Sequence, residues 1–202
     1  MDANNIQFTK LEILIVKYLF KHYKDRFNSR QLAKVLDRNH AHANKLCNAL
    51  VKKLLLKKES MGNSVYFSFD YYNERAINFI EYLINLEETE FPKWLSVIVH
   101  SLKKFEDKIT IGMLFGSSVK NNNFKDIDVL LVYKKDKARE INKIKDAIRT
   151  SQLIEQPIRY VDVEEKDIFL NKEDKIFYNI LSNNLVFHGS EKYVEVIKRC
   201  LK

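Results

Sequence analysis

The stretch from Met113 to Tyr133, MLFGSSVKNNNFKDIDVLLVY, contains two apolar runs separated by a polar loop. The first run ends at Gly116 and Ser117, and the second starts beside Asp126 and Asp128. Short apolar runs bounded by turn residues are typical of buried strands. Because residues two apart in a strand point to the same face, the two carboxylates are expected to lie side by side where the second strand begins.

Two adjacent carboxylates predict a cation site, because they repel each other unless a positive charge lies between them. Oxygen ligands suit Mg²⁺, with Mn²⁺ as the alternative, and Mg²⁺ is typically held by one or two carboxylates plus substrate phosphates. Gly116 and Ser117 predict a sharp turn into a helix start, where backbone N–H groups can bind phosphate. Ser118 and Lys120 are candidate further donors to the same phosphates.

These residues resemble the motif of the minimal nucleotidyltransferases in the DNA polymerase beta superfamily. That family carries Gly-Ser, a spacer, and Asp-x-Asp on a strand, matched here by Gly116, Ser117, Asp126 and Asp128. The resemblance implies Mg²⁺-dependent transfer of NMP from an NTP to an acceptor hydroxyl, with Gly116, Ser117, Ser118 and Lys120 binding the nucleotide. Here the spacer is short, and the Arg-Gly found after Gly-Ser in many members is absent.

The same resemblance implies a third catalytic carboxylate on a later strand. Composition and alternation predict a strand over residues 157–163, which contains Asp162. The family likeness makes Asp162 the third metal ligand, together with Asp126 and Asp128, and the group that accepts the hydroxyl proton. The alternative is that Asp162 only ends a strand or caps the helix after it.

The N-terminal part predicts three helices and a β-hairpin. Apolar spacing favours helices over 7–23, 30–36 and 40–53, with Leu32 and Val35 facing inward in the second, and a hairpin over 54–69. This order resembles a winged helix-turn-helix domain, whose third helix enters the DNA major groove. The resemblance implies a set of polar DNA contacts on or near that helix: Arg30, His42, Asn44, Lys45, Asn48 and Lys52. Dimerisation or protein docking is the alternative use of such a domain.

The charge distribution supports a polyanionic partner for this part. The chain of 202 residues carries a net charge of +8, and residues 1–70 hold thirteen Lys/Arg against six Asp/Glu, a net of +7. No apolar run reaches the roughly 18 residues of a membrane span, and the first residues lack the apolar core of a signal peptide. The two cysteines lack metal-ligand spacing. We therefore expect a cytoplasmic protein without membrane contact.

The predicted architecture is α+β, with a mixed sheet flanked by helices in the C-terminal part. Residues 1–70 form the winged helix, residues 71–91 a linker helix that could pair in a homodimer, and residues 92–202 the nucleotidyltransferase domain. Three functions remain open: an active nucleotidyltransferase, a DNA-binding regulator whose C-terminal domain binds nucleotide with little turnover, and an antitoxin-like partner of an all-helical protein. The sequence does not distinguish DNA from RNA, or one NTP from another.

Overall fold

The computed structural model describes residues 7–120, 124–151, 154, 156–170 and 172–201. The chain divides into two compact units, Met1–Leu83 and Ile84–Lys202. The division falls inside helix α4 (Glu74–Leu86), within the segment predicted to link two domains. Each unit combines helices with a β-sheet, which confirms the predicted α+β class. Within the described residues, no helix has both the length and the apolarity to cross a membrane.

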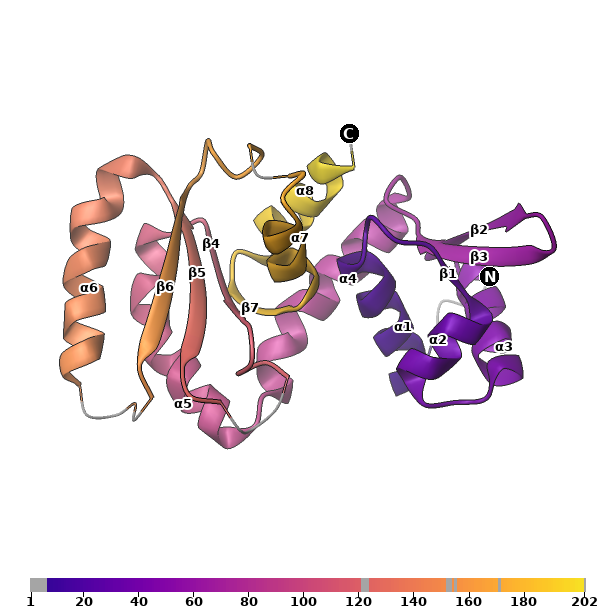
Figure 1. The fold of residues 1–202 in the computed structure, drawn as a ribbon, viewed down its shortest axis with the longest axis horizontal. Helices are drawn as coiled ribbons and strands as arrows, with labels where there is room; N and C mark the ends of the chain where they lie inside the picture. The colour runs from indigo at the N-terminus through magenta and orange to yellow at the C-terminus, as the bar shows by residue number, and fades with distance from the viewer. Residues whose placement is uncertain (1–6, 121–123, 152–153, 155, 171, 202) are drawn as a thin grey trace. The chain divides into compact units, whose positions relative to one another are not determined.

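The N-terminal unit contains three helices and a small antiparallel sheet (Figure 1). Helices α1 (Lys10–Lys21), α2 (Ser29–Leu36) and α3 (His40–Lys52) precede the hairpin of strands β2 (Leu56–Met61) and β3 (Ser64–Phe69). The sequence did not predict strand β1 (Phe27–Asn28), which pairs with β3 and gives the sheet order β1-β3-β2. Two residues are too few to show an alternating pattern in the sequence, so only the pairing with β3 makes β1 a strand.

Each of the three helices begins at a side-chain cap. Thr9 and Glu12 form a reciprocal capping box at α1, Asn28 and Gln31 form another at α2, and Asn39 caps α3. Such caps satisfy backbone N–H groups that have no partner inside the helix. They explain why the helices start where they do.

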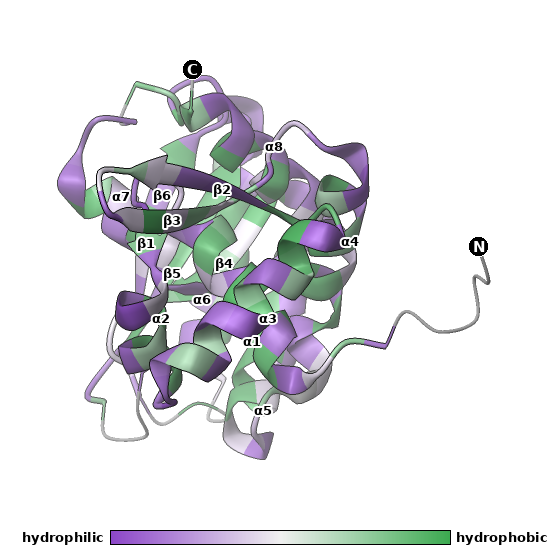
Figure 2. Ribbon diagram, turned by 90° about the vertical axis from the view of Figure 1, so that its right-hand side faces the viewer, coloured by the Kyte–Doolittle hydropathy of each residue, from purple (hydrophilic) through white to green (hydrophobic). Residues whose placement is uncertain are grey.

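Apolar faces of these helices meet in the core of the N-terminal unit. The fully buried residues include Val16 of α1, Leu32 of α2 and Leu50 of α3. Figure 2 shows hydrophobic and hydrophilic residues on the same helices, as expected for helices covered on one face only. The prediction for Val35 was wrong: its side chain is 41% exposed, because the inward face of α2 is made by Leu32, Ala33 and Leu36.

A buried carboxylate connects two helices of this core. The Lys53 ammonium donates to Glu12 Oε1 at 2.7 Å, and the Glu12 side chain is only 6% exposed. Burial by itself raises the pKa of Glu12, but hydrogen bonds from Lys53 and Thr9 and the Lys53 charge outweigh it and lower that pKa. The ionised carboxylate therefore stabilises the folded N-terminal unit.

Replacing Glu12 by Gln should destabilise the N-terminal unit by about 2 kcal/mol at about pH 7, since the cap and the ion pair both weaken. A lowered folded-state pKa contributes stability above the ordinary value of 4.5 and loses it as the pH falls through the folded-state pKa. The difference from wild type should therefore shrink at about pH 3. Hydrogen exchange of the α1 and α3 amides, followed by mass spectrometry, measures it.

The matched control is Glu59→Gln, which removes an ion pair with Arg26 whose two side chains are 61% and 55% exposed. This change should cost at most about 0.5 kcal/mol. Equal effects of the two substitutions, or an effect of Glu12→Gln that does not depend on pH, would contradict the account of Glu12.

The C-terminal unit contains a four-stranded mixed sheet. Its strands are β4 (Ile111–Phe115), β5 (Ile127–Tyr133), β6 (Ile158–Glu164) and β7 (Asn184–His188). The order is β6-β5-β4-β7, and only β5 and β6 run parallel. The longer helices are α5 (Lys93–Leu102), α6 (Ala138–Thr150), α7 (Lys175–Ser182) and α8 (Ser190–Cys200), and the short 3-10 helices are η2 (Glu87–Glu90), η3 (Lys103–Lys108) and η4 (Lys135–Lys137).

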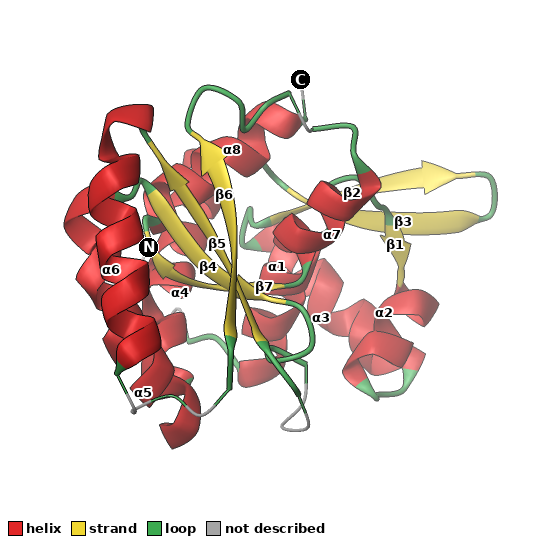
Figure 3. Ribbon diagram, turned by 60° about the vertical axis from the view of Figure 1, so that its left-hand side comes forward, coloured by secondary structure: helices red, strands yellow, loops and turns green. Residues whose placement is uncertain are grey.

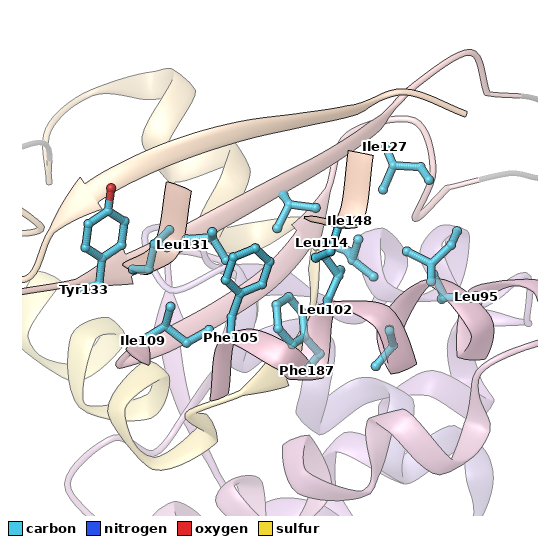
Figure 4. Close-up of a cluster of buried hydrophobic side chains, with 14 residues drawn as sticks. Leu95, Leu102, Phe105, Ile109, Leu114, Ile127, Leu131, Tyr133, Ile148 and Phe187 are labelled. Atoms are coloured by element: carbon cyan, nitrogen blue, oxygen red, sulfur yellow. The ribbon is translucent and has the colours of Figure 1, made fainter. Parts of the chain in front are cut away.

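Helices cover both faces of this sheet. Helices α5 and α6 lie on one side, and α7 and α8 on the other (Figure 3). One core cluster lies between the sheet and α5 and α6, and we call this side the α5–α6 face. Strand β5 contributes Ile127, Val129, Leu131 and Tyr133 to it, and Figure 4 shows Ile127 and Tyr133 at opposite ends of that row. The intervening residues of β5 therefore point to the other face.

Candidate functional site

The turn after β4 lies directly against the carboxylate of Asp128. Phe115, the last residue of β4, pairs with Asp128 on β5, and Gly116 follows with a φ of +78°. A Cβ atom at Gly116 would lie 2.2 Å from Oδ2 of Asp128. Glycine is therefore required at position 116 for two reasons: the backbone is left-handed, and the carboxylate leaves no room for a Cβ atom. The predicted phosphate turn therefore lies against one of the two predicted carboxylates.

Residues 116–120 form a turn. The Lys120 N–H donates to the Ser117 carbonyl at 3.1 Å, and both residues are exposed. The helix start that we expected after Gly116 and Ser117 is absent from the described residues 116–120, and residues 121–123 of the predicted loop lie outside the described part of the chain. Ser117 and Lys120 are thus the polar side chains that this turn presents.

Ser118 has a different environment from its neighbours. It is 2% exposed, and its hydroxyl donates to the carbonyl of Phe115 at 3.2 Å. This hydrogen bond closes the turn on itself. The structure therefore does not present the Ser118 hydroxyl to a ligand, contrary to the expectation that it adds a phosphate donor.

The carboxylates of Asp126 and Asp128 lie together at the start of β5. Asp126 immediately precedes the strand, and its side chain is 17% exposed. Burial first, and then the charge of Asp126, raise the pKa of Asp128, while the charge of Arg159 lowers it. Arg159 Nη2 also lies 2.8 Å from Asp126 Oδ2. The predicted pair of carboxylates is present, and a guanidinium partly compensates its charge.

Asp162 does not join this pair. In the parallel register of β5 and β6, Asp128 lies beside Arg159, whereas Asp162 lies beside Leu131 on the α5–α6 face. Asp162 follows Arg159 by three positions, an odd number, so the two side chains point to opposite faces of the sheet. The Lys145 ammonium of α6 binds both oxygens of Asp162, at 2.7 and 2.5 Å. The expected convergence of three carboxylates is therefore not found.

Arg159 is the residue of this site that the sequence prediction missed. It lies on the strand predicted to carry the third carboxylate, but no local pattern distinguishes it from an exposed strand residue. Only the pairing Asp128↔Arg159 places it at the site. The register of two parallel strands, separated here by a whole helix, was the missing information.

The carboxylate oxygens of Asp126 and Asp128 are compatible with Mg²⁺ whose other ligands are phosphate oxygens and water. Within the described residues, no group of three or more His, Cys, Asp or Glu side chains could hold a metal ion. Two carboxylates without further protein ligands match the way Mg²⁺ binds through one or two carboxylates, water and substrate phosphates. The residues that would hold the ion are Asp126 and Asp128.

The predicted nucleic-acid contacts gather on one helix. His42, Asn44, Lys45 and Lys52 of α3 are exposed, whereas Ala43, Cys47 and Leu50 on the other side of the helix are buried. Asn48 is half-buried and donates to the carbonyl and side-chain oxygens of Asn44, at 2.8 and 3.1 Å. Arg30 is exposed near the start of α2. The structure thus brings five of the six candidates onto α3.

Comparison of the chain with protein-family models, with curated proteins and with solved structures finds no match.

Replacing Gly116 by Ala should lower the unfolding free energy of the C-terminal unit by about 3 kcal/mol, because the methyl group meets Asp128 and the backbone stays left-handed. The single tryptophan, Trp94 of α5, reports the unfolding of this unit by fluorescence.

A double-mutant cycle with Asp128→Ala isolates the close contact from the backbone strain. Without the carboxylate, Gly116→Ala should cost only about 1 kcal/mol. The same cost in both backgrounds would mean that the carboxylate does not lie against the turn.

Proposed function

We propose that this protein binds a nucleoside triphosphate as its Mg²⁺ complex at Asp126, Asp128 and the Gly116–Ser117 turn, and that its N-terminal unit binds nucleic acid. The observation that carries the first part is the contact between the Asp128 carboxylate and the Gly116 backbone. It joins the two halves of a phosphate–metal site, a glycine turn and a carboxylate pair, within one short segment. Neither half alone would distinguish such a site from a chance motif.

Each residue has a role in this binding. Gly116 allows phosphate oxygens to approach the backbone, and the exposed Ser117 hydroxyl and Lys120 ammonium are donors to them. Asp126 and Asp128 would hold Mg²⁺, which neutralises phosphate charge when bound. The Arg159 guanidinium, 2.8 Å from Asp126, is a further group that can bind a phosphate oxygen.

Nucleotidyl transfer is the second candidate function. It would move NMP from the NTP to an acceptor hydroxyl and release pyrophosphate, and it would use the same turn and carboxylate pair. The position of Asp162 disfavours it, since this carboxylate points to the other face of the sheet and is held by Lys145. Arg159, a cation, lies beside Asp128 instead. Binding with little turnover is therefore the function that the arrangement supports better.

Titration with a fluorescent ATP analogue should show binding that requires Mg²⁺ and is lost in EDTA. The double variant Asp126→Ala/Asp128→Ala should weaken this binding at least about tenfold, because the metal loses its protein ligands. The control Asp136→Ala/Asp146→Ala removes the same charge from two exposed positions and should change the affinity less than about twofold.

The same samples separate the two candidate functions. Pyrophosphate release from α-labelled NTP, with label appearing on an acceptor, would establish nucleotidyl transfer and contradict nucleotide binding with little turnover. Binding that is equal in the presence and absence of Mg²⁺, or equal in both double variants, would refute the proposed site.

The N-terminal unit is proposed to bind nucleic acid through the exposed face of α3. Residues 1–70 carry a net charge of +7, and the cationic side chains on α3 include Lys45 and Lys52. A basic surface supplies mainly non-specific affinity that falls with salt. His42, Asn44 and Asn48 add hydrogen-bonding groups of the kind that contact bases or phosphates.

Duplex DNA should bind with an affinity that falls steeply between low and high salt, and Lys45→Ala/Lys52→Ala should reduce the slope of log K against log salt by about 2. The control Lys10→Ala/Lys24→Ala changes two exposed lysines outside α3 and should alter the slope less. An affinity that Lys45→Ala/Lys52→Ala leaves unchanged would point to protein docking on α3 instead.

A further inference from the structure

A cavity of about 720 Å³ lies at the end of the C-terminal sheet where β5 and β6 finish. Its walls come from the start of β4, the segments that follow β5 and β6, and one face of α8. Its volume is in the range of small-molecule sites. Ligands of sheets with parallel strands commonly bind beyond the carboxyl ends of those strands, which is where this cavity opens.

This cavity is separate from the proposed nucleotide site. Asp126 and Asp128 lie at the amino end of β5, whereas Val132 and Lys134 line the cavity at its carboxyl end. Six residues from Asp128 to Lys134 correspond to roughly 20 Å along an extended strand. The two sites therefore share a strand but no residue.

Apolar side chains line the interior of the cavity. Ile111, Val132, Ile168 and Val196 are buried, with at most 6% of each residue exposed. Phe169 is half-buried, and the Arg199 guanidinium lies over its ring, 5.4 Å from the centroid. An apolar cavity wall favours a ligand with an apolar group, because burying that group removes it from water.

The charged side chains around the cavity have an excess of cations. Five Lys or Arg side chains face three Glu side chains, a net charge of +2. Lys134 and Lys135 are exposed and make no ion pair within the described part of the chain. Glu195 is shared, since Lys192 Nζ lies 3.0 Å from one of its oxygens and Arg199 contacts the other. One carboxylate therefore compensates two cations.

The geometry of α8 places these groups on one side of the helix. Lys192, Glu195, Val196 and Arg199 are spaced by three, one and three residues, so they form a single face. That face contributes two cations and one apolar side chain to the cavity wall. The cavity wall thus combines apolar side chains with cations. These cations include Lys134 and Lys135 after β5 and Lys192 and Arg199 on α8.

We propose that this cavity binds a small organic anion, with a flat apolar group seated on Ile111, Val132 and Val196 and a carboxylate or phosphate held by Lys134, Lys135 and Arg199. Arginine and lysine bind both kinds of anion, and the apolar interior selects against inorganic ones. The proposal does not depend on nucleotide binding at Asp126 and Asp128.

Titration of the full chain with anilinonaphthalene sulfonate in EDTA tests the cavity without metal-dependent binding. Saturable fluorescence enhancement is expected, and Lys134→Glu/Lys135→Glu should weaken the affinity on the order of tenfold, since two attractive charges become repulsive. The control Lys93→Glu/Lys104→Glu reverses two exposed charges away from the cavity and should change it less than about twofold.

Displacement of the probe by phenyl phosphate and by benzoate identifies which anion the site prefers. Either compound should displace it, and failure of both would overturn the proposal. So would equal affinities of the two double variants for the probe. Amide chemical shifts of the wild-type chain give a check that needs no variant: changes on titration should centre on residues 132–135 and 164–169, and changes confined to other residues would refute the site.

Discussion

The alternation of side chains along β5 is the constraint on which the C-terminal unit depends. This strand pairs with β4 on one side and β6 on the other, so its backbone groups are satisfied within the sheet. Ile127, Val129 and Leu131 point to the α5–α6 face, which leaves Asp128 on the opposite face beside the turn of Gly116. A shift of one residue would move the Asp128 carboxylate into the apolar core of the α5–α6 face, where burying an unpaired charge is costly. The pairing register thereby determines what the site contains.

The same constraint explains how far sequence reasoning could go. Local patterns were enough for the buried runs of β4 and β5, for the adjacency of Asp126 and Asp128, and for the helices with clear apolar periods. The Gly116 turn was also predictable, because a glycine between an apolar run and a polar loop indicates a sharp change in backbone direction.

Most of the failures share one cause, which is information held in tertiary pairing. Asp162 has the composition and setting expected of a strand carboxylate, yet its face depends on the register of β6 against β5. Arg159 was overlooked for the same reason. Strand β1 is too short to leave a pattern. Ser118 is a local failure, since its buried hydroxyl donates to the Phe115 carbonyl within the same turn.

The ion pair between Arg159 and Asp126 has a consequence for the folding of this unit. Many small metal-binding domains are unfolded without their ion, because the unfolded chain rarely contains a preformed site and the ion's binding free energy drives folding. Here the chain supplies its own counter-ion, 2.8 Å from one carboxylate, so the geometry of the site exists before any ligand binds. Removal of divalent ions should leave the sheet intact. A divalent ion bound at Asp126 and Asp128, as proposed, would compete with the Arg159 guanidinium for Asp126, so the ion concentration would govern occupancy of the proposed site and not the folding of the sheet.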